Sequence, residues 1–199
     1  MKKTIVILNI IFLSFCSLVN AQRTKTVSMS EMANYPLGSI MGYPQIPKDV
    51  AYLKDDTGLL DKYLGKWKGT ANERTLEFEF TKQLEVDDYN GGAKRDKVIG
   101  RLIAKDANGK VIFDTSNQDE LPLKGWTFTA GLKRYVMSYT GLKLECGESG
   151  FVFLERVDDI LKINFLPQGD IIVIGDEPGR CPKDYKPILN RTGLELTKQ

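Results

Sequence analysis

The chain contains no histidine. This absence excludes the side chain that activates the nucleophile in Ser-His-Asp and Cys-His enzymes, and it removes the commonest protein ligand of zinc and of haem iron. The chain also lacks a phosphate-binding Gly-x-x-x-x-Gly-Lys loop and the glycine fingerprint of dinucleotide-binding folds. The sequence therefore predicts no catalytic residues, no metal site and no cofactor, and it favours a protein that is not an enzyme.

Long hydrophobic runs are missing except at the start of the chain. Lys2 and Lys3 precede an apolar stretch over residues 4–13, and residues 19–21 then carry the short side chains that a signal peptidase reads. We predict that residues 1–21 are a cleaved signal peptide. The stretch is shorter than the roughly 20 apolar residues of a membrane-spanning helix. The expected location is therefore the periplasm or the extracellular medium, with no transmembrane segment after cleavage.

Cysteine is also scarce, with three residues in the chain. Cys16 lies inside the predicted signal peptide, and Phe15 stands where a lipoprotein signal carries a small residue, so lipid anchoring through Cys16 is disfavoured. Cys146 and Cys181 remain, and two cysteines in an oxidising compartment allow one intramolecular pairing. We predict a structural disulfide, because the Cys-x-x-Cys spacing of a redox-active pair is absent.

Neither sign of charge predominates after signal removal. Without Lys2 and Lys3, 26 basic residues face 26 acidic ones. Nucleic-acid binding requires a basic stripe, so nucleic acid is excluded as an expected partner. The sequence leaves the partner open between a small apolar ligand and another envelope protein, and it leaves the oligomeric state unknown.

The chain is expected to divide into an extended N-terminal segment over residues 22–57 and one β-domain over residues 58–199. The N-terminal segment contains Pro36, Pro44 and Pro47, which interrupt both helices and strands. Its tyrosines favour wrapping around the domain over a free linker.

Alternating side chains dominate the rest of the chain. A helical turn is predicted over residues 57–64, followed by about ten strands with turn signals between them. Asn108-Gly109 indicates a type I′ hairpin turn, and Asp158-Asp159 indicates a second tight hairpin. These features predict an all-β antiparallel meandering barrel, with a β-sandwich as the alternative. The predicted strands cover residues 65–70, 75–81, 98–105, 110–114, 126–129, 135–139, 151–157, 160–166, 171–174 and 192–197.

The stretch Leu64-Gly65-Lys66-Trp67-Lys68-Gly69-Thr70 follows the predicted helical turn. A short helical turn, Gly-x-Trp and a first meandering strand together resemble the opening of lipocalins. In that family the tryptophan closes the barrel floor, and an arginine near the final strand packs over the indole. The resemblance implies these structural roles for Trp67 and Arg191.

The whole chain also resembles an uncharacterised family of exported bacterial proteins. The match rests on the signal peptide, on the stretch from Leu60 to Gly69, on Cys146-Gly147 and on Cys181-Pro182. This resemblance covers most of the mature chain, and it implies the fold but no activity.

Aromatic residues on the predicted strands are the candidate binding site. They either line a cavity for an apolar ligand or fill the barrel as a packed core, and the second arrangement is common in small barrels. The cavity-lining candidates are Phe78, Phe80, Trp126, Phe128, Tyr135, Tyr139, Phe151, Phe153 and Phe165.

Acidic residues provide the remaining candidates. Glu145, Glu148, Asp176 and Glu177 flank the two cysteines, and a converging pair of carboxylates can hydrolyse glycosides, although a role as solvated loop residues is favoured. Residues 87–92 are acidic but lack the ligand spacing of a calcium loop, so a polar hairpin tip is favoured there.

Three functions remain in order of preference. The first is a lipocalin-like, non-enzymatic module that binds a small apolar ligand. The second is an envelope protein that binds other proteins through its N-terminal segment or an exposed strand. The third is a hydrolase that uses carboxylates alone.

Overall fold

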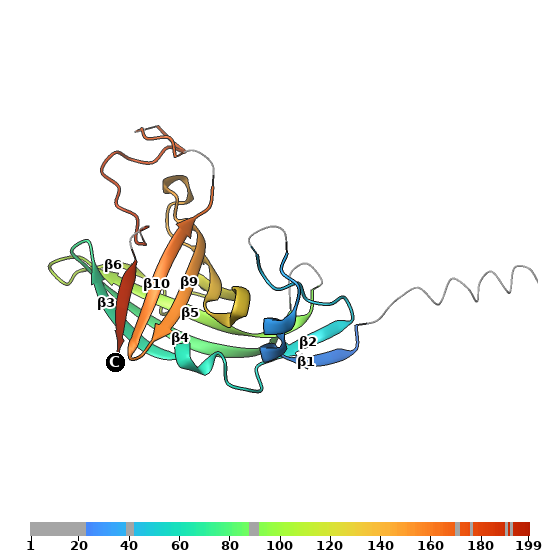
Figure 1. Ribbon diagram of the computed structural model, residues 1–199. Coiled ribbons are helices and arrows are strands. Elements are labelled where there is room, and N and C mark those ends of the chain that lie inside the picture. Colours follow the sequence, from blue (N-terminus) through green and yellow to red (C-terminus); the bar gives the residue numbers. More distant parts are fainter. Residues whose placement is uncertain are drawn as a thin grey trace, which may run out of the picture.

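Eight antiparallel strands form a closed up-and-down barrel in the computed structural model, which describes residues 23–38, 42–87, 92–169, 172–175, 177–189, 191 and 193–199 (Figure 1). Each strand pairs with the next along the chain, and the β3–β11 pair closes the ring. The predicted meandering barrel is thereby confirmed over the sandwich. The barrel strands are β3 (Gly65–Ala71), β4 (Arg74–Val86), β5 (Lys94–Lys105), β7 (Leu123–Phe128), β8 (Tyr135–Thr140), β9 (Ser149–Val157), β10 (Ile160–Pro167) and β11 (Leu194–Lys198).

Three short strands extend this sheet beyond the barrel. β1 (Lys25–Ser28) pairs in parallel with β2 (Val50–Lys54), and β2 pairs in parallel with the start of β5. β6 (Val111–Asp114) pairs with the far end of β5. The predicted signal peptide and Cys16 lie outside the described residues. The remaining elements are the 3-10 helices η1 (Met29–Asn34), η2 (Asp61–Tyr63), η3 (Ala130–Leu132) and η4 (Leu144–Cys146).

The alternation on β4 shows why this sequence forms a barrel wall. Leu76, Phe78 and Phe80 are buried, whereas the glutamates between them lie on the outer face. Glu77 pairs there with Lys105 at 2.9 Å and with Lys68 at 3.4 Å on the two neighbouring strands. Since side chains of a strand alternate between its faces, one surface of β4 forms core and the other meets solvent.

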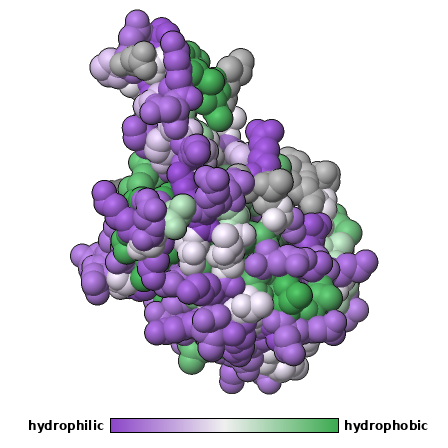
Figure 2. Space-filling view, turned by 90° about the vertical axis from the view of Figure 1, so that its left-hand side faces the viewer, coloured by the Kyte–Doolittle hydropathy of each residue, from purple (hydrophilic) through white to green (hydrophobic). Residues whose placement is uncertain are grey.

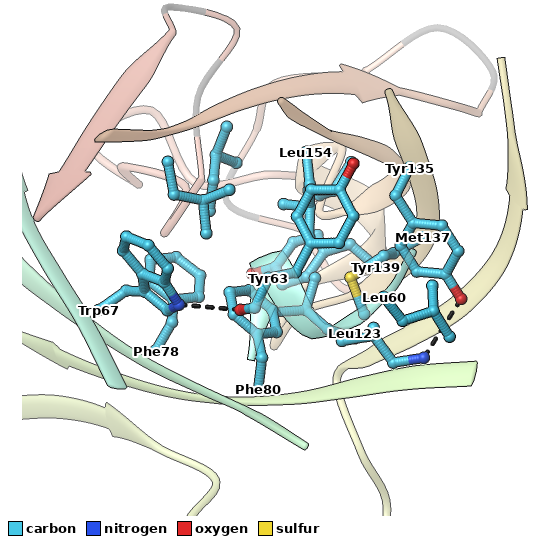
Figure 3. Close-up of a cluster of buried hydrophobic side chains, with 14 of the residues drawn as sticks. Leu60, Tyr63, Trp67, Phe78, Phe80, Leu123, Tyr135, Met137, Tyr139 and Leu154 are labelled. Carbon is cyan, nitrogen blue, oxygen red and sulfur yellow. Dashed lines mark hydrogen bonds between the residues drawn. The ribbon is translucent and has the colours of Figure 1, made fainter. Parts of the chain in front are cut away.

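Trp67 lies in the buried cluster beside Tyr63 (Figure 3), at the end of the barrel that we call the floor. Its indole is 1% exposed, and the indole nitrogen donates a hydrogen bond of 2.8 Å to the Tyr63 carbonyl of η2. The Arg156 guanidinium lies 4.7 Å from the ring centroid. The prediction that Arg191 covers the indole is therefore wrong: Arg191 lines a groove beside Leu144 instead.

A buried acidic network anchors the helical turn beneath the barrel. The Asp55 carboxylate accepts hydrogen bonds from the backbone N–H groups of Leu59 and Leu60 at 2.6 and 3.1 Å, and it pairs with Lys82 at 3.1 Å. Asp96 accepts a hydrogen bond from the N–H of Asp55 at 2.8 Å. These contacts hold the segment that inserts Leu60 and Tyr63, both fully buried, into the barrel.

One of the two predicted hairpin turns differs in detail from expectation. The hairpin between β5 and β6 forms where it was predicted, but Gly109 alone has a positive φ, of 81°, and its N–H donates to the Asp106 carbonyl. A type I′ turn needs positive φ at both central residues, so this hairpin uses a different turn. The tight hairpin at Asp158-Asp159 is present, with Val157 paired to Ile160.

The segment predicted as a buried strand over residues 171–174 is not one. Its described residues Ile172, Val173 and Ile174 are 44%, 50% and 60% exposed. They form only an isolated bridge, from Ile174 to Cys181, in the loop between β10 and β11. The apolar run does not enter the core because the disulfide at Cys181 holds this loop beyond the end of the barrel (Figure 1).

Candidate functional site

Most of the aromatic candidates lie inside the barrel, as Figure 3 shows for four of them. A void large enough for water would leave accessible surface on the side chains around it, and these rings have almost none. Gly100 leaves space for the Phe80 ring, because a Cβ at this position would lie only 2.7 Å from that ring. These rings therefore form a packed interior. The residues concerned are Phe78, Phe80, Phe128, Tyr135, Tyr139 and Phe165, each at most 5% exposed.

The other aromatic candidates lie on the outer face. The Trp126 ring stacks on Phe151 with centroids 5.4 Å apart, and Tyr43 of the N-terminal segment meets its edge at 4.9 Å. Phe153 lies beneath the Arg134 guanidinium at 5.1 Å. All these rings are only partly buried. This outer cluster attaches the N-terminal segment to the barrel wall.

The end of the barrel opposite Trp67, which we call the mouth, is covered by the loop between β10 and β11 (Figure 1). The predicted disulfide between Cys146 and Cys181 is confirmed, with an S–S distance of 2.05 Å. Arg74, at the start of β4, donates hydrogen bonds of 3.0 and 2.8 Å to the carbonyls of Lys186 and Pro187. The disulfide and this arginine tie the second half of the loop to η4 and to β4.

Glu148 connects the loop between β8 and β9 to the loop between β10 and β11 through buried hydrogen bonds. Its side chain is fully buried, and its carboxylate accepts hydrogen bonds from the N–H of Lys143 at 3.0 Å, the hydroxyl of Tyr185 at 2.7 Å and the N–H of Ile188. Burial is the larger cause, and the hydrogen bond to Glu148 the second, that raises the pKa of Tyr185. The phenol therefore stays protonated and keeps donating to the carboxylate.

Glu148→Ala is expected to lower the free energy of unfolding by about 3 kcal/mol, because it leaves buried donors without their charged acceptor. Urea unfolding followed by circular dichroism measures the loss. Glu145→Ala is the matched control, since this neighbouring glutamate is exposed, and a change within about 0.5 kcal/mol is expected there. Equal losses in the two variants would contradict the role given to Glu148.

The mouth groove is a depression of about 420 Å³ on the solvent side of these contacts. Ile112, Leu142 and Ile188 give it apolar surface, and three cations and one carboxylate also line it. The Lys143 ammonium lies 5.1 Å from the centroid of the Tyr185 ring. This groove was not predicted from the sequence, because its residues come from four distant parts of the chain and no local pattern connects them. The lining residues are Arg74, Ile112, Leu142, Lys143, Pro182, Asp184, Tyr185, Lys186 and Ile188.

The acidic candidates do not form a common site. Glu145 lines a second groove, Glu148 is occupied by its three donors, and Glu177 is exposed and paired with Arg180 at 2.8 Å. Asp176 and most of residues 87–92 lie outside the described residues. Over the described part of the chain, no cluster of three or more acidic or cysteine side chains is placed to hold a metal ion.

The fold and its contacts define a lipocalin-like all-β barrel whose lumen is filled and whose mouth carries a ligand-sized groove. Comparison with known proteins finds no matching family model, no matching curated protein and no matching solved structure. Within the described residues, the helices are too short or too polar to span a bilayer.

Proposed function

We propose that the protein is an exported binding module that takes a small apolar ligand at the mouth groove. The supporting observation is the groove itself, whose volume of about 420 Å³ lies within the range of small-molecule sites. Ile112, Leu142 and Ile188 supply apolar surface to it. The packed lumen leaves the mouth as the better place for a ligand.

The rim charges favour an apolar ligand that carries an acidic group. Arg74, Lys143 and Lys186 surround the groove, and Asp184 is the one acid among its lining residues. Two of the cations are tied to the mouth, since Arg74 holds backbone carbonyls and Lys143 lies over Tyr185. Cations held in place in this way bind a carboxylate at a lower entropic cost than freely moving ones.

The rigid mouth also supports a role in binding. The disulfide, Arg74 and the buried Glu148 carboxylate fix the loops before any ligand arrives, which reduces the ordering that binding would require. A disulfide of this kind persists in oxidising compartments, in keeping with the proposed signal peptide and an extracytoplasmic location.

Leu142→Asp is expected to weaken the binding of decanoate at least about tenfold, because it replaces an apolar lining residue with a negative charge that repels the ligand's carboxylate. Leu142 is 56% exposed, so the fold tolerates the change. Isothermal titration calorimetry measures the affinity. Leu84→Asp is the matched control, since Leu84 is 67% exposed on β4 and lies outside the groove.

Binding of decanol, which has no carboxylate, measures the contribution of the apolar surface without that of the charges. Lys186→Glu is expected to weaken decanoate while leaving decanol unchanged. Native mass spectrometry of protein purified from its own host should also show a retained small molecule that Leu142→Asp loses. Absence of retained ligand together with absence of saturable decanoate and decanol binding would contradict the proposed function.

A further inference from the structure

The loop between β10 and β11 forms a projecting tip, defined here as residues 172–175 and 177–181. One flank of this projection carries hydrophobic surface, visible at the top of Figure 2, while the rest of it is hydrophilic. Ile172, Val173 and Ile174 are each about half exposed. Contiguous apolar surface of this kind marks interaction sites in proteins that stay in water.

Along residues 173–175, the backbone groups on one edge form hydrogen bonds with described residues and those on the other edge do not. The N–H of Cys181 donates to the Val173 carbonyl at 2.9 Å, and the N–H of Gly175 donates to the Cys181 carbonyl at 3.0 Å. Within the described part of the chain, the N–H and the carbonyl of Ile174 have no hydrogen-bond partner. An extended edge of this kind is a template for another strand.

A groove of about 400 Å³ lies at the base of the tip and is lined in part by Ile172. Leu144, Pro167 and Ile172 contribute apolar surface to it, while Glu145 and Arg191 supply opposite charges. The tip therefore presents exposed branched side chains next to a partly apolar hollow. Surfaces that contain both a projection and its matching hollow can pair with a copy of themselves.

We propose that the tip binds the tip of a second copy of this chain, with residues 172–175 of the two copies pairing as antiparallel strands about a two-fold axis. In such a pair one residue supplies both the donor and the acceptor to its symmetry mate, as the open N–H and carbonyl of Ile174 allow. Exposed side chains of each copy enter the groove of the other.

The charges of the tip favour a second copy over a lipid surface. Glu145 and Arg191 have opposite signs in one groove, and Glu177 is paired with Arg180. A two-fold axis can place each charge opposite its complement on the partner. An anionic membrane would require an excess of cations, which these residues do not provide.

Analytical ultracentrifugation of the full-length mature protein tests this assignment, at concentrations from about 5 to about 500 µM. The expected result is a reversible monomer–dimer equilibrium. Ile174→Lys should raise the dimer dissociation constant at least tenfold, because the ammonium would be buried against its copy. Leu84→Lys, which changes a more exposed leucine far from the tip, should leave the constant unchanged, and circular dichroism should report native folds for both variants.

A protein that stays monomeric over the whole range overturns the proposal, even where it binds vesicles of phosphatidylglycerol or another protein. A dimer that Ile174→Lys leaves intact, or that Leu84→Lys weakens equally, also overturns it. Decanoate binding reports on the mouth groove alone, so failure of the dimer and failure of the proposed ligand site are observed separately.

Discussion

Trp67→Ala is expected to lower the free energy of unfolding by about 3–5 kcal/mol, the range for removing a large aromatic side chain from a core. The indole is 1% exposed, and its loss opens the floor of the barrel. The hydrogen bond to the Tyr63 carbonyl disappears at the same time. Arg156, whose guanidinium lies 4.7 Å from the ring centroid, loses the surface on which it packs.

Trp126→Ala is the matched control, since Trp126 is the only other tryptophan in the chain. Its ring lies on the outer face and is partly exposed, so a loss below about 2 kcal/mol is expected. Urea unfolding followed by far-ultraviolet circular dichroism compares the variants without depending on tryptophan fluorescence. Equal losses from the two substitutions would show that Trp67 does not have a special role in closing the barrel.

Removal of the disulfide by C146A and C181A together is expected to cost about 4 kcal/mol in the chain-entropy account, which scales with loop length. The two cysteines are 35 residues apart in the sequence and both are buried. Their loss frees the loop between β10 and β11, which crosses the mouth. Urea unfolding measures the change, and limited proteolysis should give new cleavage near Pro182.

Reduction of the wild-type protein is the internal comparison. Dithiothreitol should destabilise the wild type by a similar amount and leave the double variant unchanged. A double variant as stable as the oxidised wild type would mean that the hydrogen bonds of Glu148 and Arg74 hold the mouth without the covalent link.

The barrel could be predicted because its strands carry one clear signal. On β4, leucine and phenylalanine alternate with glutamate, so the face that enters the core is unambiguous. The disulfide could be predicted because removal of the predicted signal peptide would leave two cysteines and therefore one pairing. The first inference needs only the pattern of neighbouring residues, and the second needs only the number of cysteines.

Face assignment fails where both faces of a strand are apolar. On β9, Phe151, Val152, Phe153 and Leu154 follow one another, and alternation does not distinguish the inner from the outer set. The structure buries Val152 and Leu154 and leaves the two phenylalanines on the outside, contrary to their selection as lining residues. An aromatic side chain on a strand therefore does not by itself indicate that the residue faces the inside of the barrel.

Long-range partners are the other part that the sequence does not provide. The cations over Trp67 are Arg156 of β9 and Lys198 at the end of β11, not an arginine from the segment before β11, because barrel closure decides which strand ends reach the indole. The mouth groove brings Arg74 together with Lys143 and Lys186 across more than half of the β-domain. Residues so far apart meet only through the three-dimensional fold.

The closure of the ring through β3 and β11 has a consequence for the rate of folding. Thr197 and Lys68, which meet across this pair, are 129 residues apart in the sequence. Such distant pairings form late, since a long chain segment must be ordered before the contact rewards it. Until then β3 and β11 present open edges, and in this interval the chain is most prone to aggregate.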